Sequence, residues 1–360
     1  MFLREELSKR NIPDILTFAD GEKVTLPEQW EKRRLEIVDI LSREEYGYAP
    51  KAPFNVTSEI VSCKEHNYAG KAVSSNIKIK VGTDAGEFVF PLYQIIPNNI
   101  EKSPAFVHIA FRSDVPDMYM PVEEIIDNGF ALFMFNYNDI SYDGKDGFSS
   151  GVAVHYDRKK YSWGKISMWA WAASRVMDYL QTLKSLDLDN IAVTGHSRLG
   201  KTCLWCGAND TRFQFIFSNN SGCSGDAVTR GKTGEHVDAI TKNFDYWFCS
   251  DYQKYVNKEE TMPFDQHFLV AAIAPRRVYC GAAAEDTWAD PYSQFLSYYA
   301  ASDVYELLGK KRLSCEDRMP VPGDTYDGGD LGYHLRSGEH FFSRYDWNRY
   351  MQYMKNKMNQ

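Results

Sequence analysis

The 360-residue sequence lacks any apolar run long enough to cross a membrane. Its strongest apolar stretch, GFALFMF at residues 129–135, is far shorter than the roughly 20 residues that a spanning helix needs. It also lacks a concentrated basic face, because 41 lysines and arginines are scattered among 49 acidic residues and the net charge is −8. We expect a soluble protein that binds neither membrane nor nucleic acid; these features do not predict its oligomeric state.

Cysteine is scarce, and the seven cysteines form no spaced framework. An odd number cannot all pair within one chain, so we expect mostly reduced, buried thiols. The C-x-x-C at Cys203 and Cys206 stands alone inside an expected helix, which favours core packing over a redox or zinc role. The H-E-x-x-H, phosphate-loop and dinucleotide motifs are also absent.

Residues 1–18, MFLREELSKRNIPDILTF, mix charges of both signs and have no apolar h-region. They do not predict a secretory signal. The sequence as it stands predicts a cytoplasmic protein, and a secreted or periplasmic one only if a signal segment has been removed.

The length favours one α/β catalytic domain preceded by an extension. Residues 1–55 are charged and helix-prone, and LPEQWEKRRLEIVDILSREEYG at 26–47 places apolar residues at helical spacing before Pro50 and Pro53, which we expect to end the helix. We interpret 1–55 as a helical extension packed on the core, and 56–360 as the catalytic domain.

The remaining chain predicts a sheet whose first strands are antiparallel and whose later strands are mostly parallel. From about residue 56 to 96, alternation in SSNIKIKVG and GEFVFPLYQIIP predicts an antiparallel pair at one sheet edge. Further on, continuous apolar runs separated by helical stretches predict a mostly parallel sheet with helices on both faces. Residues 223–265 and 315–337 are richer in glycine and aspartate, and we expect them to be insertions that cover a cleft. The apolar runs are PAFVHIAF, GFALFMFNY, NIAVTGHS, FQFIFSNN and RRVYCGAAAE.

The segment NIAVTGHSRLGKTCLWC predicts a strand, a Gly-x-Ser turn and a helix. This is the context of a nucleophile elbow, where a small residue such as Gly195 permits a sharp, strained turn that exposes Ser197. The second glycine of the usual pattern is replaced by Leu199, and Gly200 follows one place later. The alternative is that Ser197 merely caps the helix. A nucleophile in an α/β-hydrolase fold requires an acid and then a histidine later in the chain.

An acid is available where RRVYCGAAA ends, at Glu285-Asp286. A carboxylate at the carboxyl end of this strand can reach a histidine, and we favour Asp286, with Glu285 left open. Asp290 precedes a proline and is typical of a turn.

Only two histidines follow this acid, His334 and His340. His340 comes just before a final helix with aromatic anchors, so we favour it as the base and keep His334 as the second choice. His267 is interpreted as a structural histidine. The neutral imidazole would take the serine proton, and the carboxylate would hold its tautomer.

Several segments together resemble the glucuronoyl esterase family over roughly residues 100–350. The resemblance implies an α/β-hydrolase fold and a serine carboxylesterase without metal or organic cofactor. It also implies a substrate, the ester between 4-O-methyl-glucuronic acid of xylan and alcohols of lignin. The matching segments are GHSRLGK, WAWAASRVMDYL, SNNSGCSGDA, WF at 247–248, PFDQHFLVAAIAPR, EDTWADP and SGEHFF.

The resemblance also implies roles for single residues. Ser197 matches the nucleophile, His340 the general base, and Arg198 the arginine that helps to bind the oxyanion. Three further residues match or suit contacts with the sugar: Lys201 with its hydroxyls, Trp247 along the uronate site, and Glu235 as a hydrogen-bond acceptor.

The sequence departs from the family pattern at two places. Many members carry a catalytic glutamate where this chain has Asn220, and Asp286 fits the version in which the acid follows the later strand. His196 stands where cysteine is common, and Glu339 precedes His340, so the family's disulfide at this place is not expected. Two other functions therefore stay open: an acetyl xylan esterase, and a carbohydrate-binding protein that has lost activity.

Overall fold

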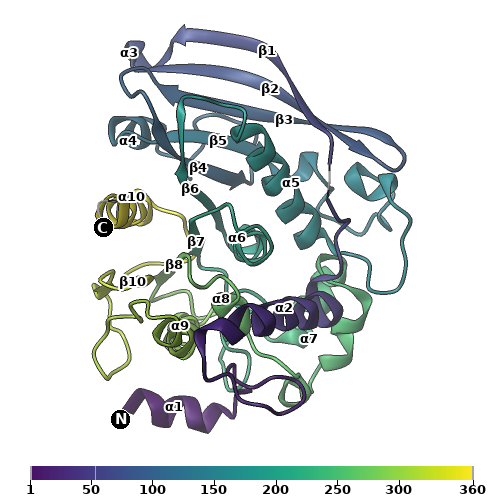
Figure 1. The fold of residues 1–360 in the computed structure, drawn as a ribbon, viewed down its shortest axis with the longest axis vertical. Coiled ribbons are helices and arrows are strands. Elements are labelled where there is room, and N and C mark those ends of the chain that lie inside the picture. The colour runs from purple at the N-terminus through teal and green to yellow at the C-terminus, as the bar shows by residue number, and fades with distance from the viewer. Residues whose placement is uncertain (1, 53, 359–360) are drawn as a thin grey trace.

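The computed structural model describes residues 2–52 and 54–358. Within them a sheet of ten strands runs through the molecule in the order β1-β2-β3-β5-β4-β6-β7-β8-β10-β9 (Figure 1). The strands are β1 (Val56–His66), β2 (Ala72–Thr83), β3 (Gly86–Pro97), β4 (Ser103–Ala110), β5 (Ala131–Asn136), β6 (Leu186–His196), β7 (Phe215–Asn219), β8 (Arg277–Ala283), β9 (Thr325–Tyr326) and β10 (Leu331–Arg336).

The helices precede, connect and follow these strands. They are α1 (Phe2–Arg10), α2 (Trp30–Leu41), α3 (Asn67–Gly70), α4 (Val122–Asp127), α5 (Lys165–Leu180), α6 (Arg198–Asn209), α7 (Val237–Phe244), α8 (His267–Ala271), α9 (Pro291–Leu307) and α10 (Arg344–Met358). Shorter turns are η1 (Pro27–Gln29), η2 (Ser42–Tyr46), η3 (Tyr137–Asp139), η4 (Gly151–His155), η5 (Asp245–Trp247), η6 (Ser250–Tyr255) and η7 (Glu259–Thr261).

The central strands β5, β4, β6, β7, β8 and β10 are parallel, so their carboxyl ends meet at one edge of the sheet. Successive side chains of β4 enter different cores: Val107 packs with α5 and α6, and Phe106 packs with α4 and α10. Both faces are therefore covered, as Figure 1 shows. The predicted α/β-hydrolase fold, mostly parallel with helices on both faces, is confirmed.

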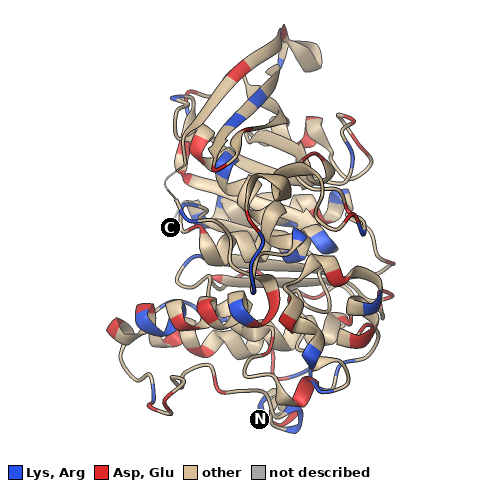
Figure 2. Cartoon of the chain, turned by 90° about the vertical axis from the view of Figure 1, so that its right-hand side faces the viewer, with Lys and Arg blue, Asp and Glu red and all other residues tan. Residues whose placement is uncertain are grey.

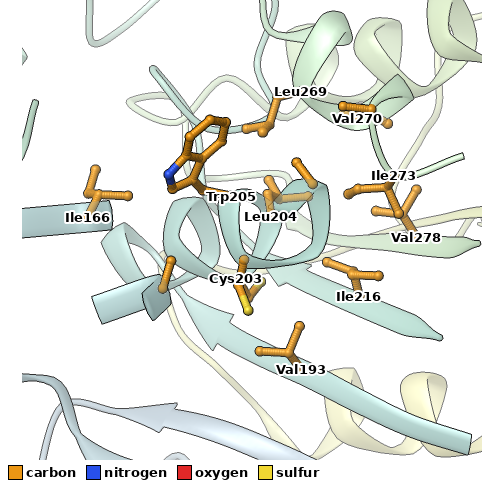
Figure 3. Packing of buried hydrophobic residues seen from close by; sticks show 14 of the residues in the cluster. Ile166, Val193, Cys203, Leu204, Trp205, Ile216, Leu269, Val270, Ile273 and Val278 are labelled. Carbon is orange, nitrogen blue, oxygen red and sulfur yellow. The ribbon is translucent and has the colours of Figure 1, made fainter. Parts of the chain in front are cut away.

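Helix α6 is held against the sheet by its apolar face. Cys203 lies on the side of the helix that faces Val193, and Trp205 lies on the far side of the helix near Leu269 (Figure 3). Cys203 and Cys206 are buried free thiols, as the core-packing interpretation of the C-x-x-C predicts. Since α6 begins directly after Ser197, this packing fixes the position of the serine.

Two parts of the sheet differ from the prediction. The pair β2–β3 is antiparallel as expected, but it is not at the edge, because β1 pairs outside β2. Strand β1 was missed since its side chains are almost all exposed and show no buried alternation. The interpretation of 315–337 as an insertion was wrong for its last part, where 331–336 forms buried β10 beside β8.

The helix within 26–47 is also confirmed, but it ends earlier than predicted. Helix α2 continues into the π-turn η2, and the chain turns at Gly47 with φ 80°. A Cβ at Gly47 would lie 2.4 Å from the Ser162 carbonyl oxygen, so this position needs glycine. Pro50 lies beyond the end, and Pro53 lies outside the described residues.

Apolar side chains of α1 and α2 belong to the same core as α5 and α6; they include Leu3, Leu7, Trp30 and Ile37. The boundary at residue 55 stays a prediction. Basic and acidic residues are interspersed along the elements (Figure 2). No helix within the described ranges is long and apolar enough to span a membrane.

The π-turn carries a fully buried carboxyl group, Glu45, whose two oxygens lie 3.2 Å from the side-chain nitrogen of Gln266. Burial raises the pKa of Glu45 to about 8, and the nearby charge of Asp265 acts in the same direction. The folded protein therefore keeps this proton between pH 4.5 and about 8, whereas the unfolded chain has lost it. Through this group, stability falls as pH rises across that window.

The substitution Glu45→Gln removes this pH dependence. We expect the free energy of unfolding of the variant, relative to wild type, to rise by a few kcal/mol (~1.4 kcal/mol per pKa unit) between pH 5 and pH 8. Urea unfolding at pH 5, 6.5 and 8 measures this.

Glu44→Gln is the control. Despite burial, hydrogen bonds from Lys254 and Tyr255 lower the pKa of Glu44, so the change in the free energy of unfolding that this substitution causes should be equal at pH 5 and pH 8. Parallel curves for Glu45→Gln and wild type would contradict the assignment.

Candidate active site

Ser197 lies at the turn between β6 and α6 with φ 58° and ψ −125°, a strained conformation for a residue with a side chain. Its N–H donates to the Asn219 carbonyl oxygen at 2.8 Å. A Cβ at Gly195 would lie 2.2 Å from the Leu199 carbonyl oxygen, which explains the glycine before the serine. A Cβ at Gly200 would come within 3.0 Å of Ser221, so Gly200 serves the close packing after it. The helix-cap alternative does not hold, since the Ser197 side chain makes no capping hydrogen bond.

An acid and a histidine lie beside this turn. Asp286 follows β8 and is buried, and its Oδ2 lies 2.6 Å from Nδ1 of His340, on the loop between β10 and α10. The neighbouring Glu285 turns toward the backbone instead, where its Oε1 accepts the Gly338 N–H at 3.1 Å. The structure therefore pairs His340 with Asp286, the favoured acid.

The histidine packs against the residue that precedes the serine and makes no hydrogen bond to the serine itself. Within the described residues no hydrogen bond joins Ser197 Oγ to His340, as is common in a free enzyme, where catalytic hydrogen bonds tighten only with substrate. The His340 ring packs on His196, the residue before the serine, with ring centroids 4.4 Å apart. The His340 side chain keeps 42% of its surface exposed, so a substrate can approach it.

The other candidates have structural partners. His334 is buried, with its Nε2 2.8 Å from Oδ1 of Asp346, and His267 Nε2 lies 2.9 Å from the Pro13 carbonyl oxygen. Asp290 caps α9 by accepting the Ser293 N–H at 3.1 Å, in line with its predicted turn role. None of the three belongs to the site.

Arg198 is anchored by a carboxylate that sequence reasoning missed, Asp143. The Arg198 guanidinium pairs with Oδ2 of Asp143 and lies over the ring of Trp247, 4.7 Å from its centroid. Trp247 Nε1 donates to Oδ1 of the same carboxylate at 2.7 Å, and Tyr137 donates to Oδ2 at 2.9 Å. Asp143 follows β5, so its position after a parallel strand was the only available signal.

Lys201 and Glu235 lie close enough for their charges to interact. Lys201 is buried and donates to the Ser221 carbonyl oxygen; burial lowers the pKa of this lysine, and nearby Glu235 opposes the change. The Glu235 N–H donates to the Trp288 carbonyl oxygen at 3.0 Å. Trp288, which sequence reasoning did not select, is 56% exposed two residues after Asp286. Its position in the EDTW segment, two residues after the predicted acid, was the sequence signal that could have identified it as a site residue.

Asn220, where many family members carry the acid, bridges backbone segments. Its Oδ1 accepts the Ala283 N–H at 3.0 Å and its Nδ2 lies 3.5 Å from the Phe341 carbonyl oxygen. It therefore ties the end of β8 to the histidine loop.

Two further features concern metal-binding groups and cavities beyond the residues of the predicted site. No group of three or more histidine, cysteine or carboxylate side chains within the described ranges is arranged to hold a metal ion. A cavity of about 680 Å³ between α2, α5 and α6 is lined by Trp171 and Trp205, among others, and none of Ser197, Asp286 or His340 contributes to it.

A strained serine at a strand-to-helix turn, followed in the chain by an acid and a histidine that contact each other, defines a serine hydrolase of the α/β-hydrolase fold. The family model described as fungal glucuronyl esterase matches residues 79–309. A carbohydrate esterase from an unknown prokaryotic organism is 33% identical, over 98% of this chain and 91% of its own. The chain belongs to the glucuronoyl esterase family, whose members are carboxylic-ester hydrolases.

Further relatives agree with this assignment. A 4-O-methyl-glucuronoyl methylesterase of Schizophyllum commune is 29% identical, over 84% of this chain and 75% of its own. A promiscuous esterase of carbohydrate esterase family 15 from a marine bacterial metagenome superposes with a TM-score of 0.88 at 32% identity, covering 96% of each chain. A glucuronoyl esterase from Solibacter usitatus gives 0.87 at 32%, covering 96% of this chain and 97% of its own.

Proposed function

We propose that the protein hydrolyses glucuronoyl esters of plant cell-wall glycans, most specifically the 4-O-methyl-glucuronoyl esters of xylan. The observation that carries the proposal is the pair of cationic side chains, Arg198 and Lys201, on the first turn of the helix that follows Ser197. Arg198 would bind the oxygen of the reacting carbonyl, and Lys201 would bind hydroxyls of the sugar acyl group. The relatives named as glucuronoyl esterases support the same substrate class.

The proposed reaction proceeds through an acyl-enzyme. His340 takes the Ser197 proton while Oγ attacks the ester carbonyl, and Asp286 stabilises the imidazolium. Arg198, held by Asp143, donates to the oxyanion of the tetrahedral intermediate. Collapse breaks the bond to the alcohol, which leaves with the proton from His340. Water, deprotonated by His340, then attacks the acyl group and releases the uronic acid and free Ser197.

The sugar contacts are proposed from the surrounding side chains. Lys201 and Glu235 offer a donor and an acceptor for sugar hydroxyls, and the exposed ring of Trp288 offers a face for the pyranose. Trp247 is 3% exposed, and its indole N–H donates to Asp143. We therefore infer that Trp247 contributes to the uronate site by packing against Arg198 and not by contacting the sugar.

Arg198→Leu should lower kcat for a glucuronate ester by about 10²- to 10³-fold with little change in KM, because the donor is needed mainly in the transition state. Arg198→Lys should recover part of this loss, since it restores charge without the planar fork. Steady-state kinetics on benzyl glucuronate measure both. A raised KM with unchanged kcat would instead assign Arg198 to ground-state binding.

A panel of esters tests the substrate class. We expect methyl and benzyl glucuronate to be turned over with higher kcat/KM than p-nitrophenyl acetate or feruloyl esters. Release of acetate from acetylxylan without turnover of uronate esters would establish an acetyl xylan esterase instead. If no ester reacts and no fluorophosphonate labels Ser197, the protein is a carbohydrate-binding relative that has lost activity.

A further inference from the structure

His196 lies between the nucleophile and the base. It is the last residue of β6, it is 3% exposed, and it precedes Ser197 directly. Its ring meets that of His340 at 4.4 Å between centroids and 42° between planes. Within residues 2–52 and 54–358, no other aromatic ring packs against His340.

The His196 ring is itself fixed. Its Nδ1 lies 2.6 Å from Oδ1 of Asn219, whose Nδ2 donates to the Gly281 carbonyl oxygen at 3.3 Å. That second bond orients the amide, so Oδ1 accepts and the His196 proton resides on Nδ1. Behind it, Phe342 stacks at 6.1 Å and Tyr119 packs at 5.2 Å.

His196 also carries no charge at neutral pH. Burial lowers the pKa of His196 to about 3, and the neighbouring His340 acts in the same direction. His340 becomes a cation when it takes the serine proton, so a neutral neighbour avoids repulsion at that moment. The two imidazoles therefore differ in role: one is exposed and paired with Asp286, and the other is buried and neutral at neutral pH.

Asp286 alone does not orient the base. A single hydrogen bond at Nδ1 fixes the position of that atom but leaves the ring plane free to tilt. The buried His196 ring, which packs against His340 at 42° between the ring planes, limits this tilt. Displacements of about 1 Å in such groups cost on the order of 100-fold in rate.

We propose that His196 is a positioning residue for His340, a rigid neutral platform that holds the imidazole in the plane in which Nε2 meets Ser197 Oγ. This inference rests on the proposed role of His340 as the general base. It requires the flat ring of His196 rather than any proton transfer by it.

Three variants separate the ring from its hydrogen bond. His196→Gln keeps a donor for Asn219 but lacks the ring, and should lower kcat on benzyl glucuronate about 10- to 100-fold with KM changed less than about twofold. His196→Phe keeps a flat ring and should stay within about threefold of wild type. If His196→Gln does not fold, His196→Leu takes its place. Wild-type kcat in the ringless variant, or an equal loss in His196→Phe, overturns the proposal.

The rate at which a fluorophosphonate labels Ser197 gives a second readout that is independent of sugar binding, and it should fall by the same factor in His196→Gln. His267→Gln changes a buried histidine whose Nε2 pairs with the Pro13 carbonyl oxygen and should leave this rate unchanged. In a His340→Ala background, His196→Gln should have no further effect, because it acts through His340. A full additional loss there overturns the positioning role. Wild-type activity in His340→Ala would instead refute the proposed function itself.

Discussion

Ser197→Ala should reduce hydrolysis of methyl glucuronate by about 10⁵- to 10⁶-fold, the loss typical of removing the nucleophile of a serine triad. The geometry behind this expectation is the strained turn at Ser197, which follows His196, the residue that packs on His340, and leaves the serine oxygen free of a capping bond. Alanine keeps the Cβ at this φ, so the fold should survive. Steady-state assays with pure protein and circular dichroism measure the two effects.

Ser297→Ala is the matched control for this change. Ser297 is buried on α9, and its hydroxyl has no partner within the described residues, so its removal leaves nothing unpaired. We expect wild-type kinetics from this variant. Retained uronate esterase activity in Ser197→Ala, above the trace that contaminating wild type could supply, would refute the assignment of the nucleophile.

Asp286→Asn should lower kcat by about 10⁴-fold while KM changes little. The amide cannot stabilise the imidazolium, and it favours the wrong tautomer of His340 by donating toward Nδ1. Kinetics on benzyl glucuronate across a pH series would measure the loss at the optimum of each protein.

Glu285→Gln tests whether the choice between neighbouring acids is right. Glutamine can still accept the Gly338 N–H through its side-chain oxygen, so this variant should stay within about threefold of wild type. The opposite outcome, a large loss in Glu285→Gln and near wild-type activity in Asp286→Asn, would make Glu285 the acid. The His340–Asp286 contact would then be an arrangement of the resting enzyme only.

Local patterns predicted the centre of the site. The strand, the Gly-x-Ser turn and the following helix lie within one short segment, and the order of serine, acid and histidine follows from the parallel strands. The same patterns placed Arg198 and Lys201 on the first turn of α6 without knowledge of the fold. Asp286 was favoured over Glu285 as the acid at the end of this strand, and the structure pairs it with His340.

The features that were missed depend on contacts between distant segments. Asp143 lies in a polar loop whose sequence carries no motif, and only the fold brings it to Arg198, 55 positions away. Strand β10 contains Gly332, which lies against the Tyr279 ring, and buried His334, so its apolar pattern is broken. The packing of His196 on His340 is likewise invisible in a pattern of residues.

The central claim is that a uronoyl group passes through Ser197, and trapping that intermediate tests it most directly. An aryl ester of glucuronic acid with a good leaving group should acylate the enzyme faster than water releases the acid, which produces a burst. Acid quenching followed by peptide mass analysis should find the glucuronoyl mass on the peptide that contains Ser197, and none in Ser197→Ala. Turnover of the ester with an unmodified Ser197 peptide, or with the mass on another residue, would contradict the account.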